Sequence, residues 1–351
     1  MANKRVFYAV RQIGFSKDGL NAYTPAHGVQ SVGVTTNFNL ENVFELGQIS
    51  LYENIENLPD IQVTAEKVLD GYPLLYHLAT NGSLSASLSG RSTPKTTMAM
   101  SIFGDAQDSA SGQPIAIVTM SGLFCSTLEY QFPVQGNCTE SVTLVGNNKV
   151  WSTGVPFVFS GQFNNADTPS SVHVQRRQMV IFDGPTGIVS LDANGQTNTS
   201  LCTILPPDID GISSSGINNV IAGYRGAHIQ NIRVQTNLGR EELLELGRRT
   251  PYYRFVTFPI EVTCEIQTTM TTWDNVTARE EGNDGLGNNL TNRTIKVRLQ
   301  DSTYLNLGTQ NKLLSVSMQG GDTGGGNVVC TYNYRNYNDL VVTHPADPSG
   351  L

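Results

Sequence analysis

Residues 29–52 read VQSVGVTTNFNLENVFELGQISLY, and residues 229–252 read IQNIRVQTNLGREELLELGRRTPY. The two stretches align without a gap, and 9 of the 24 positions are identical. A second pair of stretches matches further along the chain, IQVTAE at 61–66 and IEVTCE at 260–265. Two collinear matches that also share the places of their apolar residues indicate an internal duplication.

The duplication predicts the domain organisation. A chain of 351 residues is long enough for two domains that each bury a core. We expect a first domain at residues 1–182 and a second, its duplicate, at residues 225–351. The segment 183–224 is rich in Gly, Ser, Asn and Pro, and we interpret it as the connector.

Each copy shows the same local pattern. A strand-like alternation runs into Thr-Asn and is followed by a stretch with helical spacing, at residues 40–46 and 240–246. Gly47 and Gly247 follow these stretches at the place where a left-handed helix cap is favourable. Asn39 fits the N-cap of the first stretch. The pattern predicts one short helix in each copy.

Most of the remaining chain alternates with the period of a strand. Apolar residues at 295, 297 and 299, and again at 328, 330, 332 and 334, lie between polar ones. We interpret the tyrosines at 332, 334 and 337 as core or interface residues rather than as base-stacking groups. The expected fold is mainly β: two tandem tube-like β-sandwich or barrel domains, each with a short flanking α-helix.

The composition limits the function. Only 15% of the residues are charged and the net charge is −8, which argues against a protein that grips nucleic-acid phosphates over a wide face. The five cysteines form no CxxC pair, so we interpret them as free, buried thiols of a protein made in a reducing cytoplasm. Because 18 consecutive apolar residues occur nowhere, we expect no membrane helix.

Catalytic patterns are weak. The five histidines are far apart in sequence, and the motif GxSxG of a nucleophile elbow is absent. The glycine-rich run 320–326 lacks the Lys-Ser/Thr of a phosphate loop and precedes a strand, so we interpret it as a turn. We therefore expect no enzyme, no metal and no cofactor.

Charged residues cluster around the two Glu-Leu-Gly motifs of the duplicated stretches, where local or intersubunit ion pairs are plausible. These candidates for a subunit interface are Glu41, Glu45, Glu241, Glu242, Glu245, Arg248 and Arg249.

Several stretches resemble tail tube and related virion structural proteins of tailed bacteriophages. They are GNCTESVTLVGNNKVW (136–151), GISSSGINNV (211–220), GAHIQNIRVQTNLGREELLELGRR (226–249), GGGNVVCTYNYRNYNDLVV (324–342) and TNFNLENVFELGQISLYENIENLPDIQVTAEKVLDGYPLLYHLAT (36–80). The resemblance implies a β-sandwich with a flanking helix that assembles into rings, which stack as a tube around a lumen. The chain is about twice as long as the simplest members, and the duplication accounts for the difference.

The resemblance also implies partners and a location. They are further copies of the chain, the tape measure, tail-end and baseplate proteins and, in contractile tails, a sheath. DNA would pass through the lumen without specific binding, and we expect acidic side chains on the lumen wall. The protein would belong to the virion and be made in the cytoplasm of the bacterial host. We favour a trimer with pseudo-sixfold symmetry, and a hexamer remains an alternative.

Three other functions stay open from the sequence. The first is a hub or adaptor ring at one end of the tube, which would form single rings that do not stack. The second is a β-rich virion protein that binds a receptor or a glycan, which would show an exposed aromatic cleft. The third is an enzyme with a histidine-based site assembled in three dimensions, and this is the least favoured.

Overall fold

In the computed structural model the fold is described for residues 5–17, 23–80, 85–88, 93–105, 112–153, 173–181, 205–206, 208–209, 228–274, 276–278, 291–301, 303–321, 323 and 325–344. These residues are mainly β, as expected. The predicted connector at 183–224 lies almost wholly outside them, and the domain bounds stay a prediction. None of the helices in this part of the chain is long and apolar enough to cross a membrane.

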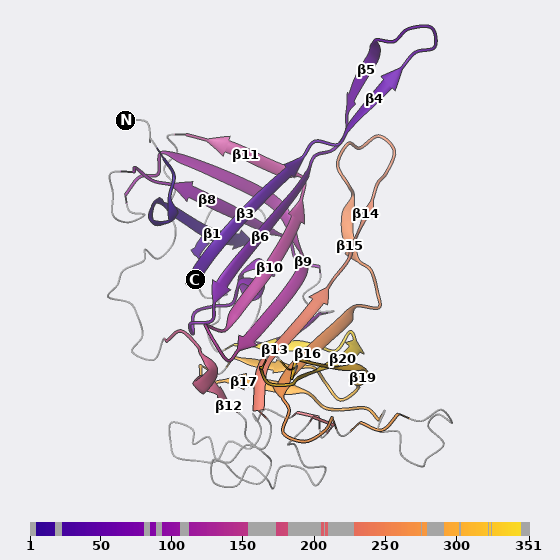
Figure 1. Cartoon of the computed structure of the whole chain (residues 1–351). Coiled ribbons are helices and arrows are strands. Elements are labelled where there is room, and N and C mark those ends of the chain that lie inside the picture. Colours follow the sequence, from indigo (N-terminus) through magenta and orange to yellow (C-terminus); the bar gives the residue numbers. More distant parts are fainter. Residues whose placement is uncertain are drawn as a thin grey trace.

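One large antiparallel sheet dominates the molecule (Figure 1). Its main path runs β19-β20-β16-β13-β9-β10-β6-β3. The strands along it are β19 (Lys312–Gln319), β20 (Val329–Tyr337), β16 (Glu261–Thr269), β13 (His228–Asn237), β9 (Ala116–Pro133), β10 (Thr139–Gly146), β6 (Asp60–Val68) and β3 (Val29–Asn37). The sheet does not close into a barrel within one chain, because β19 and β3 end its path.

The first half of the long strand β9 supports a branch of the sheet. There β9 pairs with β8 and β11, and β8 also pairs with β1, which pairs with β2. The branch strands are β1 (Arg11–Lys17), β2 (Thr24–Pro25), β8 (Thr96–Ile102) and β11 (Asn148–Ser152). Two short 3₁₀ turns, η1 (Tyr8–Val10) and η2 (Arg177–Met179), lie outside the sheet.

The main path repeats one four-strand unit. The order β3-β6-β10-β9 is followed directly by β13-β16-β20-β19, whose strands occur in the same order along the chain. The β-bulges repeat as well. Gln30 in β3 has no opposite residue on β6, and Gln230 in β13 has none on β16. In the same way, Ser126 in β9 has no opposite residue on β10, and Leu314 in β19 has none on β20. The matching positions are therefore 200 residues apart in β3 and β13, and 188 residues apart in β9 and β19.

One sequence match is out of register with this repeat. The structure pairs Thr36 with Ile61 and Thr236 with Val262, so Val262, not Ile260, occupies the place of Ile61. The match of 61–66 with 260–265 is thus displaced by two residues. A shift of two keeps every side chain on the same face of the sheet, which is why the apolar patterns still agree.

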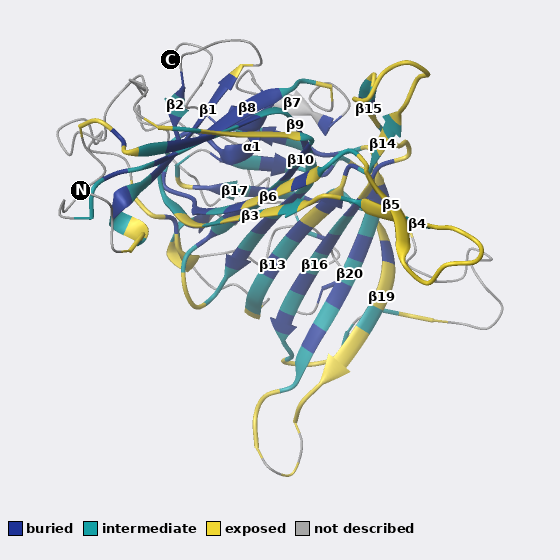
Figure 2. Cartoon of the chain, turned by 90° about the horizontal axis from the view of Figure 1, so that it is seen from above, coloured by how far each residue is buried: buried dark blue, intermediate teal, exposed yellow. Residues whose placement is uncertain are grey.

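A second layer covers one face of the large sheet. It contains the five-stranded sheet β12-β17-β18-β21-β7 and the helix α1 (Leu75–Ala79), whose five residues are all buried (Figure 2). The small sheet combines strands from both halves of the chain: β7 (Ser85–Ser87), β12 (Val180–Ile181), β17 (Lys296–Leu299), β18 (Tyr304–Asn306) and β21 (Val341–Thr343). Both layers contribute to one apolar core.

The alternating residues face that core as the sequence predicts. Tyr332 and Tyr334 on β20 are buried, and so are Val262, Cys264 and Ile266 on β16. All four cysteines within the described residues, which exclude Cys202, are free and buried. Burial raises the pKa of three of these thiols, at positions 125, 138 and 264, to about 12.

The prediction of helices at 40–46 and 240–246 is wrong. Both stretches begin β-hairpins: β4 (Leu40–Phe44) pairs with β5 (Leu51–Glu56), and β14 (Arg240–Leu243) pairs with β15 (Tyr253–Val256). We call residues 40–56 the first hairpin and residues 240–256 the second hairpin. They project from the large sheet where β3 and β13 end (Figure 1).

The Glu-Leu-Gly motif forms the hairpin tip. The N–H of Gln48 donates to the carbonyl of Glu45, and the N–H of Arg248 donates to the carbonyl of Glu245, which closes a four-residue turn in each copy. Gly47 has φ +99° and Gly247 has φ +83°, so the glycine is required by the turn and not by a helix cap. A helix also needs a face to bury, and most of the first hairpin is exposed.

Candidate assembly surfaces

The junction between β9 and β13 joins the two four-strand units. On the core face, Ile232 lies opposite Phe132, and Val234 lies opposite Tyr130, all buried. On the open face, Nε of Arg233 donates to one oxygen of Glu129 (2.6 Å). Its Nη2 donates to the other oxygen (2.9 Å), and this hydrogen bonding raises the pKa of Arg233. The junction therefore combines an apolar seam with a bidentate ion pair.

The second hairpin is seated on the first unit at this junction. Nε of Arg240 donates to the carbonyl of Cys125 (2.7 Å), and its guanidinium lies over the ring of Phe124. The ring of Tyr253 meets the same Phe124 edge to face at 5.3 Å. Burial lowers the pKa of Arg240. These contacts hold the base of the hairpin against β9.

Arg254 makes a second attachment of this hairpin. Its side chain is only 8% exposed and forms an ion pair with Glu242. Nη2 also donates to Oδ1 of Asn147 (3.0 Å) and lies 3.5 Å from Oδ1 of Asp60. Asn147 follows β10 and Asp60 begins β6, so the attachment reaches strands of the first unit.

The seven interface candidates from the sequence all lie on the two hairpins. Four of them lie at the tips, Glu45, Glu245, Arg248 and Arg249, and the other three, Glu41, Glu241 and Glu242, lie toward the bases. Glu245 pairs with Arg248 (2.8 Å), and Oε2 of Glu45 accepts a hydrogen bond from Gln48 (2.6 Å). Nη2 of Arg249 donates to the carbonyl of Glu56 (3.2 Å), which brings the second hairpin to the base of the first. Their part in an interface between subunits stays a prediction.

Sequence reasoning missed Arg240 and Arg254, whose contacts attach the second hairpin to the first unit. The signal was a difference between the copies, because the matching residues of the first hairpin are Leu40 and Asn54. A repeat comparison that looks for unlike residues at matching positions would have found both.

The two edge strands of the sheet, β19 and β3, carry apolar side chains that are partly exposed to solvent. On β19, Leu313 is buried, whereas Met318 is 42% exposed although its neighbours on β20 are buried. On β3, Val32 and Val34 are half-buried and pack against the core. Fully exposed Leu46 and Ile49 mark the tip of the first hairpin. Such residues at a sheet edge are typical of a surface that another chain covers.

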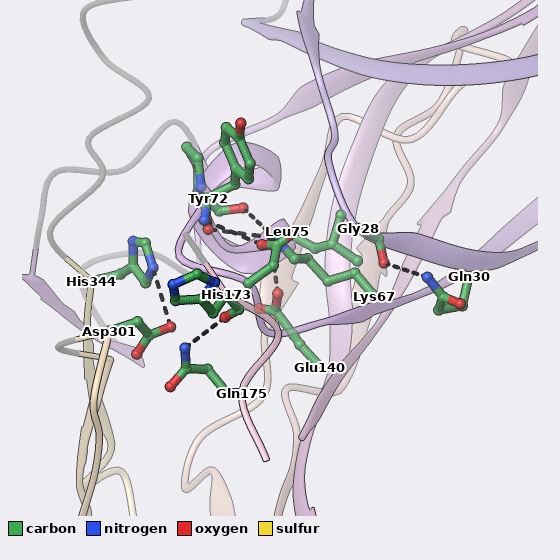
Figure 3. Close-up of polar contacts among 12 residues, drawn as sticks. Gly28, Gln30, Lys67, Tyr72, Leu75, Glu140, His173, Gln175, Asp301 and His344 are labelled. Atoms are coloured by element: carbon green, nitrogen blue, oxygen red, sulfur yellow. Dashed lines mark hydrogen bonds and ion pairs between the residues drawn. The ribbon is translucent and has the colours of Figure 1, made fainter. Parts of the chain in front are cut away.

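A buried polar cluster fixes α1 to the large sheet (Figure 3). Nζ of Lys67 lies 3.0 Å from Oδ1 of Asp70 and donates to the carbonyl of Pro73. Glu140 accepts hydrogen bonds from the N–H groups of Leu75 (2.7 Å) and Tyr76 (3.0 Å), and from the hydroxyl of Tyr130 at 2.9 Å. Burial raises the pKa of Glu140, and the charge of Lys67 opposes that shift.

The neighbouring acid Asp301 lies beside His344, with 3.9 Å between Oδ2 and Nε2. Within the described ranges, no three His, Cys, Asp or Glu residues are placed to hold a metal ion. The arrangement is that of a structural cluster whose hydrogen bonds end on the backbone of α1 and on neighbouring strands.

Asp301 provides a test by pH. Burial raises its pKa, so the folded chain keeps this proton to a higher pH than the unfolded chain, whose Asp has a pKa of about 3.9. The stability linked to the proton is present below that value and is lost as pH rises through the raised pKa. Asp301→Asn keeps the oxygen that accepts from the N–H of Thr303. Relative to the wild type, its unfolding free energy in urea is expected to rise as the pH increases above about 4. A difference independent of pH would contradict this.

Comparisons with known proteins add a distant structural likeness. No family model matches the sequence, and no curated protein matches it. Among solved structures, the chain is similar to the cap of an anti-feeding prophage, described as a tube terminating cap. The TM-score is 0.33 at 11% identity, over 44% of this chain and 94% of that chain.

Proposed function

We propose that the chain is a non-enzymatic structural protein of a bacteriophage tail, whose copies join edge to edge into closed rings that stack as a tail tube. One observation carries the proposal. The β9–β13 junction joins two like units inside the chain, and the strands left at the ends of the sheet, β19 and β3, are the counterparts of β9 and β13. The same junction repeated between chains pairs both edges.

The repeat gives the register of the proposed contact. Val234 faces Tyr130 in the internal junction, so Val34 of the next chain faces Met318. Thr236 faces Leu128, so Thr36 of the next chain faces Val316. Both pairs lie on the core face, as their counterparts in the internal junction do. In this register residues 31–37 pair with residues 315–321 of the neighbouring chain, which covers most of both edges. Such pairing is the general protection of an exposed edge strand.

A ring of three chains contains six four-strand units, and we favour it over a ring of six chains. The second layer adds bulk to one face of the sheet, and the outer side of a ring has more room than its inner side. We therefore place that face on the outside of the proposed ring. The open face then lines the bore. It carries mainly Thr, Ser, Asn and Gln, with carboxylates such as Glu129 and Glu261 paired to Arg233 and Arg335. Such a wall offers DNA few free cations, which suits passage without binding.

The remaining parts of the proposal rest on the resemblance. They are a location in the virion after synthesis in the host cytoplasm, and contacts with tape measure, tail-end and baseplate proteins. In a contractile tail a sheath would join them.

Electron microscopy of the purified protein over a concentration series tests the proposal. The expected result is closed rings with a stain-filled bore that stack into tubes, and their rotational symmetry gives the number of chains. Single rings that never stack would replace the tube by a hub or adaptor ring. Monomers at every concentration, with light scattering as a control for mass, would contradict ring assembly.

A further inference from the structure

The second hairpin packs against a neighbouring strand of the same chain, and within the described residues the first hairpin has no corresponding strand beside it. Inside the chain, Tyr253 and Arg240 hold that hairpin on Phe124 and Cys125 of β9. The first hairpin is attached to β3, the edge strand, so the strand that would seat it belongs to another chain.

The repeat identifies the residues of the missing seat. Both hairpins have the same base pairing, Leu40 with Glu56 and Arg240 with Val256, so their positions correspond at 200 residues. Tyr253 therefore corresponds to Glu53. On the receiving strand, the spacing of 188 makes Lys312 the counterpart of Phe124 and Leu313 the counterpart of Cys125.

We propose that the first hairpin of each chain docks on the neighbouring copy at the start of β19, where Glu53 pairs with Lys312 and Leu40 lies against Leu313. This docking rests on the ring proposed above. The contact between chains then differs from the contact within the chain, because an ion pair replaces the aromatic contact between Tyr253 and Phe124. This difference determines that the first unit of one chain joins the second unit of its neighbour.

The contact made by the hairpin tip also differs between the internal junction and the junction between chains. Arg249 on the second hairpin donates to the carbonyl of Glu56 within one chain. At the matching place between chains, Ile49 faces Val256. The contact inside the chain joins a guanidinium to a backbone carbonyl, and its counterpart between chains joins two apolar side chains. The partner accounts for the full exposure of Ile49 in the single chain.

The charges of the hairpins support their alternation around a ring. The first hairpin contains four glutamates and no basic residue, a net charge of −4. The second contains four arginines and three glutamates, a net charge of +1. Hairpins of the two kinds are neighbours at every junction of the proposed ring, so the arrangement keeps the acidic ones apart.

Charge reversal tests the docking. Glu53 and Lys312 are both exposed, so Glu53→Lys and Lys312→Glu leave the core of the single chain intact. Each substitution is expected to raise the concentration for half-maximal ring formation about tenfold, because like charges then meet. The double variant, with the charges exchanged, is expected to return within about threefold of the wild type. Rings that form equally well in all four proteins would overturn the docking and leave edge pairing in place.

Cross-linking gives an independent readout. Ile49→Cys with Val256→Cys is treated with a short bismaleimide, and Arg249→Cys with Glu56→Cys serves as the matched control inside one chain. The first pair is expected to produce a ladder of linked chains, and the control a single chain with an internal link. An internal link in both, in preparations that form rings, would refute the docking. Absence of rings in the wild type would instead refute the proposed function.

Discussion

Met318→Lys is expected to prevent ring closure without unfolding the chain. Met318 is 42% exposed on the free edge strand, so a lysine there reaches water in the single chain. In the proposed junction the same position corresponds to Tyr130, which is fully buried against Val234. Closing the ring would bury an unpaired ammonium group, and the concentration for half-maximal assembly is expected to rise by about a hundredfold or more. Sedimentation velocity over a concentration series measures this directly.

Ser317→Lys is the matched control for that variant. Ser317 is the next residue on the same strand but points to the open face, where its internal counterpart is the charged Glu129. A lysine there stays in water after closure, so assembly is expected to remain close to the wild type. Equal loss of assembly in both variants would point to a general effect of charge and would contradict the register. Unchanged assembly of Met318→Lys would contradict the junction itself.

Glu140→Ala is expected to destabilise the single chain by about 3–5 kcal/mol. The carboxylate is fully buried and accepts three hydrogen bonds, two of them from the backbone of α1. Its removal leaves these donors unsatisfied and removes one of the two carboxylates near Lys67, whose ion pair with Asp70 remains. Chemical denaturation monitored by fluorescence and circular dichroism measures the loss of unfolding free energy.

Ser141→Ala is the control, because Ser141 is the next residue of β10 and lies on the open face. Its effect is expected to stay within about 0.5 kcal/mol. A loss of less than about 1 kcal/mol for Glu140→Ala would show that α1 does not depend on the buried carboxylate. Glu140→Ala thus tests the stability of the single chain, whereas Met318→Lys tests the assembly of the ring.

The cluster around Glu140 also shows how the copies differ. In the second unit the counterparts of Lys67 and Glu140 are Thr268 and Cys330, both buried and neither charged. The helix α1 follows β6 in the first unit, and the buried charges hold its backbone in place. A sequence comparison aligned at 199 residues sets Lys67 against Ile266 and does not reveal this exchange.

The sequence alone determined the mainly-β class and the repeat, because alternation of apolar and polar residues directly encodes which face of a strand is buried. It also predicted that Tyr332 and Tyr334 lie in the core or in an interface, and both are buried. It recognised a left-handed conformation at Gly47 and Gly247 but assigned both glycines to helix caps, whereas they lie in hairpin turns. It did not distinguish a hairpin from a short helix, since residues 40–46 carry apolar side chains at a spacing that both allow and bury almost none of them.

Tertiary structure decided what the residues on the hairpins and edges contact. Arg240 and Arg254 are unremarkable in the sequence, and their value lies in partners more than 100 residues away. The register of the repeat likewise depends on the bulges at Gln30, Ser126 and their counterparts, and a two-residue slip leaves the apolar pattern unchanged. Long-range pairing is needed to resolve it, because periodicity records the face of a strand but not its neighbour.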